Sequence, residues 1–391
     1  PVVTRDIYSM INGVPMGTQP VSMYPHWTER WDGEDKTSWL WVAQKGGQGA
    51  IDISGSSYKQ EGILSQMFLS KSYPEGFVSV GVIDMQFLTM AIGEDGTIYT
   101  RVKDSNLLFN SSNFLDRPLT SDKEGKIKVD GSMIAYAPFD EHGGMVLYDK
   151  NSAQYLHIAD YKNWQGYNYS GKVLPLKVEE YEYGPSDARL DNMKDYSVYF
   201  VGASLVDWGD ISYMSIIKDK AGKFYMQKFK VEAYGGGSSV TKVGASFISQ
   251  SEIKGLDAVI DGTSKNCFYL CRNQDKAPYL FISKGETLYF YYTDGNKLYT
   301  CAQFDSPIAS IDAECFNNKY IIVGLESGDV FILKGEDDNS DYTLKKYVIQ
   351  QNKVIQVTDA ENKFVLFHEK DFGKIIQVRY KWKESWNESF S

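Results

Sequence analysis

Residues 307–350 read PIASIDAECFNNKYIIVGLESGDVFILKGEDDNSDYTLKKYVIQ, and this stretch decides the fold class. Its β-branched, aromatic and other apolar residues form four short runs, and residues that favour turns separate these runs. The stretch therefore predicts four antiparallel strands, at Pro307 to Phe316, Lys319 to Leu325, Asp329 to Lys334 and Tyr342 to Gln350. A further unit from Lys353 to near Trp382 supplies only three strands, so residues near the N-terminus are expected to supply the fourth.

Hairpin signals recur along the rest of the chain. The segments IGEDGTIY at 92–99 and YTDGNKLY at 292–299 both place Asp-Gly between apolar runs, which predicts a hairpin with a type I′ turn. Five further Gly-containing turns between apolar runs lie near Gly46, Gly143, Gly222, Gly328 and Gly373.

Repeated four-stranded units of about 40–50 residues are typical of a β-propeller. The sequence predicts an all-β chain with one propeller domain over residues 1–391, most simply with seven blades. Residues 1–35 are expected to be a closing strand or the tail of a preceding β-sandwich module. The run from Cys267 to Cys301 can be divided into strands in two ways, so six or eight blades stay open, and a pair of β-sandwiches is the competing fold.

Composition excludes several classes of protein. The chain has 41 Lys and Arg against 51 Asp and Glu, a net charge of −10, which does not fit a nucleic-acid partner. No apolar run approaches the ~18 residues of a transmembrane helix. The four cysteines, Cys267, Cys271, Cys301 and Cys315, do not have the spacing of a zinc site and are expected to be buried free thiols.

Motifs for cofactors, metals and catalysis are missing. The sequence contains no P-loop, GxGxxG, HExxH or GxSxG motif. The acidic run from Asp337 to Asp341 resembles a calcium loop, but Tyr342 and Val348 occupy the positions of its glycine and its last glutamate. We therefore predict no cofactor, no metal and no catalytic residue.

Four short apolar runs end in aspartate, at Asp84, Asp261, Asp312 and Asp359. Two such carboxylates facing each other across a propeller funnel would suit the acid and base of a glycosidase. Their repetition favours a structural, turn-capping role instead, because chemistry needs a given residue only once.

Aromatic residues make up 14% of the chain, which folding alone does not explain. Tyr161, Asn163, Trp164 and Tyr167 lie in a stretch whose composition indicates an inserted, exposed segment, and Trp208 lies between two aspartates. Aromatic faces and planar amides suit sugar rings or a protein partner. These five residues are the predicted ligand-binding residues. A weaker group of aromatic and histidine residues lies near the N-terminus, at Tyr24, His26, Trp27 and Trp31. The alternative for all of these side chains is packing between blades.

Two segments resemble a known family. Residues 144–156, GMVLYDKNSAQYL, preceded by MIAYAP at 133–138, resemble part of the PKD-like lipoproteins that neighbour Sus-type glycan-uptake systems in gut Gram-negative anaerobes. Val14 to Met23 and Ala50 to Ile53 fit the same pattern loosely. The resemblance covers about half of the chain. It implies the propeller-like C-terminal part of an exported protein, tethered to the outer membrane through a lipidated N-terminal region, and it carries no catalytic residue.

These observations favour a non-catalytic binding or adhesion module of the cell envelope. Its expected partner is a polysaccharide or an envelope protein. Two alternatives stay open: a glycoside hydrolase or lyase that uses funnel carboxylates, and a scaffold subunit of an outer-membrane uptake complex.

Overall fold

We describe a computed structural model of the 391-residue chain. The described residues are 5–14, 20–28, 37–55, 57–84, 88–102, 118–121, 125–130, 133–137, 144–159, 176–180, 190, 193–206, 210–234, 242–270, 279–293, 296–313, 320–327, 329–337, 344–351, 362–367 and 375–380.

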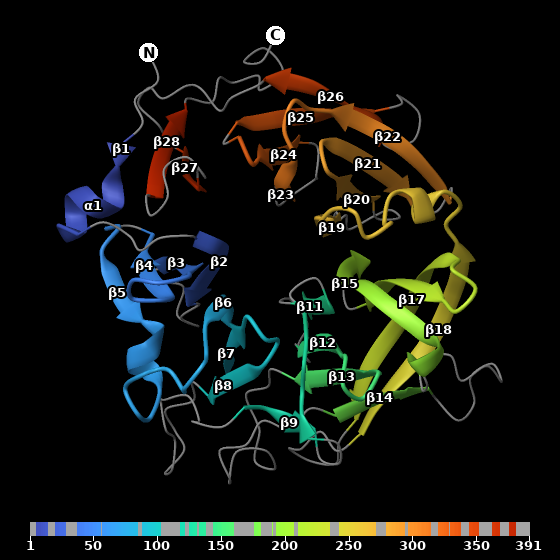
Figure 1. Cartoon of the computed structure of the whole chain (residues 1–391), viewed down its shortest axis with the longest axis horizontal. Coiled ribbons are helices and arrows are strands. Elements are labelled where there is room, and N and C mark those ends of the chain that lie inside the picture. The colour runs from blue at the N-terminus through green and yellow to red at the C-terminus, as the bar shows by residue number, and fades with distance from the viewer. Residues whose placement is uncertain are drawn as a thin grey trace.

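The described part is all-β, as predicted, and it is built mainly from antiparallel sheets. In Figure 1 the sheets follow one another around a ring in chain order, and β1 lies beside β28. Short strands separated by Gly-containing turns account for this pattern, because most strands pair with a neighbour in sequence.

The first two sheets contain seven described strands. One sheet has the order β2-β3-β4-β5 and the other β6-β7-β8. Their bounds are β2 (Pro20–Thr28), β3 (Thr37–Gln44), β4 (Ile51–Ser54), β5 (Gln60–Ile63), β6 (Ser79–Asp84), β7 (Leu88–Gly93) and β8 (Ile98–Val102). The short 3₁₀ helix η1 (Leu64–Met67) follows β5, and the two-residue strands β9 (Thr120–Ser121) and β10 (Gly125–Lys126) form a separate ribbon.

The next sheet has eight strands, in the order β11-β12-β13-β14-β18-β17-β16-β15. Its two halves are joined by the parallel pair β14–β18, in which Val178 lies opposite Val243. The bounds are β11 (Ile134–Ala137), β12 (Gly144–Asp149), β13 (Gln154–Ala159), β14 (Leu176–Glu180), β15 (Tyr196–Val206), β16 (Asp210–Asp219), β17 (Phe224–Tyr234) and β18 (Lys242–Glu252). The 3₁₀ helix η3 (Met193–Asp195) precedes β15, and η4 (Leu256–Ala258) follows β18.

Two regular four-stranded sheets follow. Their strands are β19 (Phe268–Leu270), β20 (Tyr279–Lys284), β21 (Thr287–Tyr292), β22 (Lys297–Gln303), β23 (Ile308–Ala313), β24 (Tyr320–Leu325), β25 (Val330–Asp337) and β26 (Leu344–Gln351). The four strands predicted from residues 307–350 are confirmed as β23 to β26, in that order.

The last sheet contains residues from both ends of the sequence. It has the order β1-β28-β27, with β1 (Arg5–Asp6), β27 (Asn362–Phe367) and β28 (Ile375–Tyr380). Arg5 lies opposite Gln377 in the antiparallel β1–β28 pair. The helix α1 (Ile7–Asn12) then leads to the first sheet, where the Asn12 side-chain amide donates to Tyr58 O (3.1 Å) and accepts from Gln60 N (2.9 Å).

The predicted turn type at Asp95-Gly96 is wrong. Gly96 has φ +82°, but Asp95 is not among the described residues with positive φ, which a type I′ turn requires of both residues. Gly96 N donates to Gly93 O and Gly93 N donates to Thr97 O, so the hairpin has a three-residue loop that ends in a left-handed glycine. The Asp95 carboxylate accepts from Thr97 N (3.0 Å), and this contact favours the observed loop.

The buried apolar side chains form clusters that lie between consecutive sheets or between the halves of the eight-stranded sheet. One cluster contains Trp41 of β3 and Ala91 of β7, and another contains Phe281 of β20 and Ile321 of β24. Most of the largest fully buried side chains are aromatic, so much of the aromatic content serves packing. Tyr24, from the weaker group of aromatic residues near the N-terminus, also serves packing, since it is half-buried against the cluster that contains Trp41 and Ala91.

Candidate functional site

The five predicted ligand-binding residues lie outside the described residues. Tyr161, Asn163, Trp164 and Tyr167 fall in the segment 160–175, and Trp208 falls in the segment 207–209. The strands that flank both segments are described, so the structure does show where the segments are attached.

Strand direction in the eight-stranded sheet fixes these attachment points. β14 runs parallel to β18, and their first paired residues, Val178 and Val243, lie near the start of each strand. β16 and β18 are both antiparallel to β17, so β16 and β18 run in the same direction. Consequently β14, β16 and β18 all begin at the same end of the sheet, which we call the insertion edge and define by Leu176, Asp210 and Lys242.

The insertion edge carries both predicted binding segments. Segment 160–175 ends where β14 begins, and segment 207–209 ends where β16 begins. The Gly- and Ser-rich segment 235–241 ends where β18 begins. The fold therefore brings the attachment points of the two aromatic segments to one edge, although they come from opposite halves of the sheet.

A buried polar network supports the sheet behind this edge. The Tyr155 hydroxyl of β13 lies 2.8 Å from Ser215 Oγ of β16 and 3.1 Å from Gln227 Oε1 of β17. All three side chains are buried, and burial raises the pKa of Tyr155, so its hydroxyl stays protonated. Satisfied buried hydrogen bonds of this kind fix the relative positions of the strands that they join.

The recurrent aspartates have structural partners. Asp84, at the end of β6, accepts from Trp41 Nε1 of the first sheet (3.1 Å) and from Thr89 Oγ1 of β7 (3.0 Å). Asp312 lies in β23 and is exposed, and Asp359 lies outside the described residues. Asp84 thus links two sheets, which differs from the turn-capping role predicted for it.

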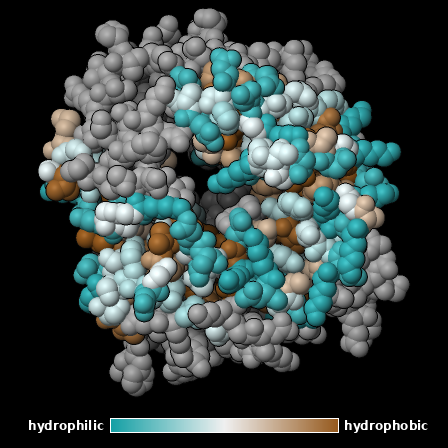
Figure 2. Space-filling model, viewed as in Figure 1, coloured by the Kyte–Doolittle hydropathy of each residue, from teal (hydrophilic) through white to brown (hydrophobic). Residues whose placement is uncertain are grey.

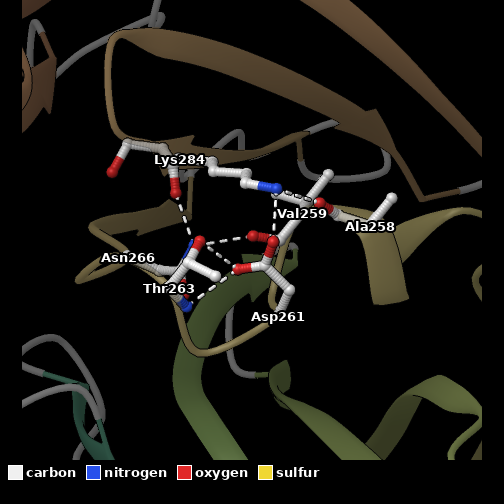
Figure 3. Close-up of polar contacts among 7 residues, drawn as sticks. Ala258, Val259, Asp261, Thr263, Asn266 and Lys284 are labelled. Carbon is white, nitrogen blue, oxygen red and sulfur yellow. Dashed lines mark hydrogen bonds and ion pairs between the residues drawn. The ribbon is translucent and has the colours of Figure 1, made fainter.

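Asp261 does cap a turn, but it lies in a connector and not at the end of a strand. Figure 3 shows its carboxylate between Thr263 and Lys284. Oδ1 accepts from Thr263 N (2.9 Å) and Thr263 Oγ1 (2.6 Å), and Oδ2 lies 2.5 Å from Lys284 Nζ. Lys284 Nζ also donates to Ala258 O (2.6 Å), while Asn266 Nδ2 donates to Val259 O and to Ser283 O. The cluster holds the connector before β19 against the end of β20.

The Asp261–Lys284 pair has two counterparts in the preceding units. Asp130, before β11, pairs with Lys150 in the β12–β13 turn, and Asp195, before β15, pairs with Lys220 in the β16–β17 turn. In each case an aspartate precedes the first strand of a unit, and a lysine lies in, or directly before, the turn between its second and third strands. We call these three pairs the connector latches. The sequence analysis missed Asp130 and Asp195. A detectable signal is the lysine 20–25 residues further along, next to a hairpin turn.

Two described carboxylates, Asp261 and Asp219, have pKa shifts that do not suit acid catalysis. The hydrogen bond from Lys284, followed by those from Thr263, holds the pKa of Asp261 well below its usual range. The backbone hydrogen bond from Lys223 likewise lowers the pKa of Asp219. A glycosidase acid needs a raised pKa so that it carries a proton near neutral pH, and these two groups have the opposite shift.

Replacing Thr89 with valine tests the structural role of Asp84. The change removes one donor to a carboxylate at nearly constant side-chain volume, so we expect the free energy of unfolding to fall by about 1–2 kcal/mol. Urea denaturation would measure the loss, with Thr300→Val on the exposed face of β22 as the control, expected within about 0.5 kcal/mol of wild type. Equal losses in the two variants would mean that Asp84 does not need this donor.

The described residues contain no group of three or more His, Cys, Asp or Glu side chains that could hold a metal ion. No helix in the described ranges has the length and apolar character needed to cross a bilayer. Cys267 and Cys301 are half-buried and form no disulfide there, while Cys271 and Cys315 lie outside the described residues.

The chain was also compared with known proteins. No protein-family model matches it, and no curated protein matches it significantly.

Proposed function

We propose that the ring of sheets is a β-propeller with seven blades. Six blades would be β2–β5, β6–β8, β11–β14, β15–β18, β19–β22 and β23–β26, and the seventh would be β27 and β28 with β1. In this assignment the eight-stranded sheet consists of two blades joined at their outer strands by the β14–β18 pair. The clusters of buried side chains between consecutive units support the assignment, because propeller blades pack face to face.

We further propose that the protein is a non-catalytic binding module that recognises a glycan or a protein partner. The observation that carries the proposal is the insertion edge, where strand direction gathers the attachment points of both aromatic segments. A rigid sheet that presents aromatic and amide side chains from neighbouring connections is a common way to build a recognition surface. The pKa of Asp261 is low, and its carboxylate is paired with Lys284 in the connector latch. Both features favour binding over hydrolysis.

The cell-envelope location is a proposal that rests on the resemblance to PKD-like lipoproteins. In this proposal the protein is exported and anchored at the outer membrane, where a polysaccharide or an envelope protein would meet the insertion edge. The net charge of −10 agrees with a neutral or basic partner.

The scaffold alternative requires a large exposed apolar patch. Met10 (70% exposed), Ile11 and Val14 form a small exposed apolar group at α1. On the face shown in Figure 2, the described apolar residues lie in small groups between hydrophilic ones. This distribution favours a polar ligand over a large protein contact on that face.

Replacing Trp164 with alanine tests the proposed function. On a glycan array, with release of reducing sugar followed in parallel, wild type should bind without releasing sugar. We expect Trp164→Ala to weaken binding by about tenfold or more, since stacking on one aromatic face contributes on the order of 1–2 kcal/mol. Trp208→Ala should weaken binding of the same ligand.

The matched control is Tyr299→Ala, which removes an aromatic side chain that is 44% exposed on β22, in another sheet. Its affinity should equal that of wild type. Release of sugar would support a glycosidase in place of the binding module. Equal losses in all three variants would show that the insertion edge is not the binding surface.

A further inference from the structure

His157 of β13 is a buried histidine without a compensating partner. Its side chain is 4% exposed, and among the described residues Nδ1 has no hydrogen-bond partner. His157 follows Tyr155 by two residues, so both side chains point into the interior of the eight-stranded sheet. A protonated imidazole at this position would be a charge in an apolar environment.

Among the described residues no charged side chain compensates His157, since burial is the only cause of its pKa shift. The titratable side chains of the cluster that faces this interior are tyrosines: Tyr148 of β12, Tyr155 of β13 itself and Tyr213 of β16, with Tyr196 of β15 and Tyr225 of β17 packed against it. Two neutral polar side chains, Ser215 of β16 and Gln227 of β17, lie against the Tyr155 hydroxyl. The remaining strands contribute apolar side chains, which are Ala135 of β11, Val178 of β14, Val198, Val201 and Ala203 of β15, Phe229 of β17, and Val243 and Ala245 of β18.

The strand next to His157 has a short ladder on each side among the described residues. Within residues 176–180, β14 pairs with β13 over two residue pairs, one of which is Leu176 opposite His157, and with β18 over three. By contrast, β17 and β18 pair over ten residues. Strands with few ladder hydrogen bonds open at a lower free energy than the rest of a sheet. Opening of β14 would therefore be the least costly way to bring water to His157.

We propose that β14 is an acid-sensitive strap: protonation of His157 releases this strand from β13 and β18 and opens the interior of the eight-stranded sheet to water. Because β14 begins where segment 160–175 ends, its release would also free one attachment of that segment. This second consequence rests on the proposed function, whereas the opening of β14 does not.

Proton linkage gives the direction in which the opening of β14 depends on pH. Burial lowers the pKa of His157 from 6.5 to about 4 in the closed sheet, while a solvated histidine keeps a pKa near 6.5. The open state therefore binds the proton more tightly, and opening becomes more favourable as the pH falls from 6.5 toward 4. These two pKa values give an opening constant roughly twentyfold larger at pH 5 than at pH 7.

Hydrogen exchange of the full chain, followed by mass spectrometry at pH 7 and pH 5, tests the proposal. After correction for the intrinsic exchange rate at each pH, peptides that cover β14 should exchange roughly twentyfold faster at pH 5. Peptides from β20 and β21, in another sheet, should keep their protection and serve as the internal reference. In His157→Gln, which cannot titrate, the acceleration in β14 should be absent. If this variant fails to fold, His157→Phe replaces it.

Two results would overturn the strap. One is the same acceleration in the variant as in wild type, and the other is equal acceleration in β14 and in β20–β21, which would indicate general acid unfolding. Glycan binding measured at the same two pH values separates this inference from the proposed function. Acid-induced opening of β14 in a chain that binds no glycan at pH 7 would leave the strap intact and contradict the glycan-binding role.

Discussion

Replacing Phe68 with alanine is expected to lower the free energy of unfolding by about 3–5 kcal/mol. Phe68 is fully buried between the first two sheets, and its ring lies 5.5 Å from Tyr99 and 5.7 Å from Tyr73, centroid to centroid, in edge-on contacts. Phe77 completes the cluster at 6.0 Å. Truncation would leave a cavity surrounded by rigid rings that cannot collapse into it, so the cost should fall in the upper part of the range for such substitutions.

Urea denaturation of wild type and variant would measure this loss. The matched control is the next residue, Leu69→Ala, because Leu69 is 49% exposed and its truncation should change stability by about 0.5 kcal/mol or less. A loss below about 1 kcal/mol for Phe68→Ala would mean that the first two sheets do not pack through this aromatic cluster.

The second large effect is expected at Gly96, in the β7–β8 turn. An added Cβ would lie 2.5 Å from Val129 O, a backbone atom that cannot move aside easily, and the residue has φ +82°. We expect Gly96→Ala to cost about 3 kcal/mol, from backbone strain together with displacement of the connector before β11. Val129 N also donates to Gly96 O, so a shift there would break the contact between this connector and the turn.

A comparison with Gly222 in the β16–β17 turn separates backbone strain from displacement of the connector. Gly222 has nearly the same conformation, with φ +88°, but its nearest contact to an added Cβ is Lys218 Cε at 3.9 Å. Gly222→Ala should therefore incur only the strain of the left-handed conformation, about 1 kcal/mol. Thermal or urea denaturation of both variants gives the comparison. Equal destabilisation would show that the turn-to-connector contact contributes nothing.

Local sequence patterns predicted the strands well and their partners less well. The strands at 307–350 follow from alternating apolar residues and turn residues that lie within a few positions of each other. The parallel pairing of β14 with β18 could not be predicted, because it joins residues 65 apart, Val178 and Val243, and depends on how two sheets pack. The turn at Asp95-Gly96 shows the limit at short range, since the Asp95 contact with Thr97 selects a different loop.

The candidate site, too, could be predicted from the sequence only in part. Composition identified the aromatic segments, but only strand direction shows that their attachment points share one edge. The connector latches could not be predicted from the sequence, because in each the aspartate and the lysine are at least 20 residues apart and no short motif marks the aspartate. His157 has no local sequence signal at all, since its burial depends on strands from both halves of the sheet.

The β1–β28 pair has a consequence for the order of events during biosynthesis. Arg5 leaves the ribosome before all of the intervening sheets, but its partner Gln377 is made only after them. β1 therefore has no native partner while the intervening sheets are synthesised, and the ring can close only once β28 has been made. Until then both ends of the growing array of sheets have unpaired backbone groups, so the nascent chain has most need of a chaperone just before β28 appears.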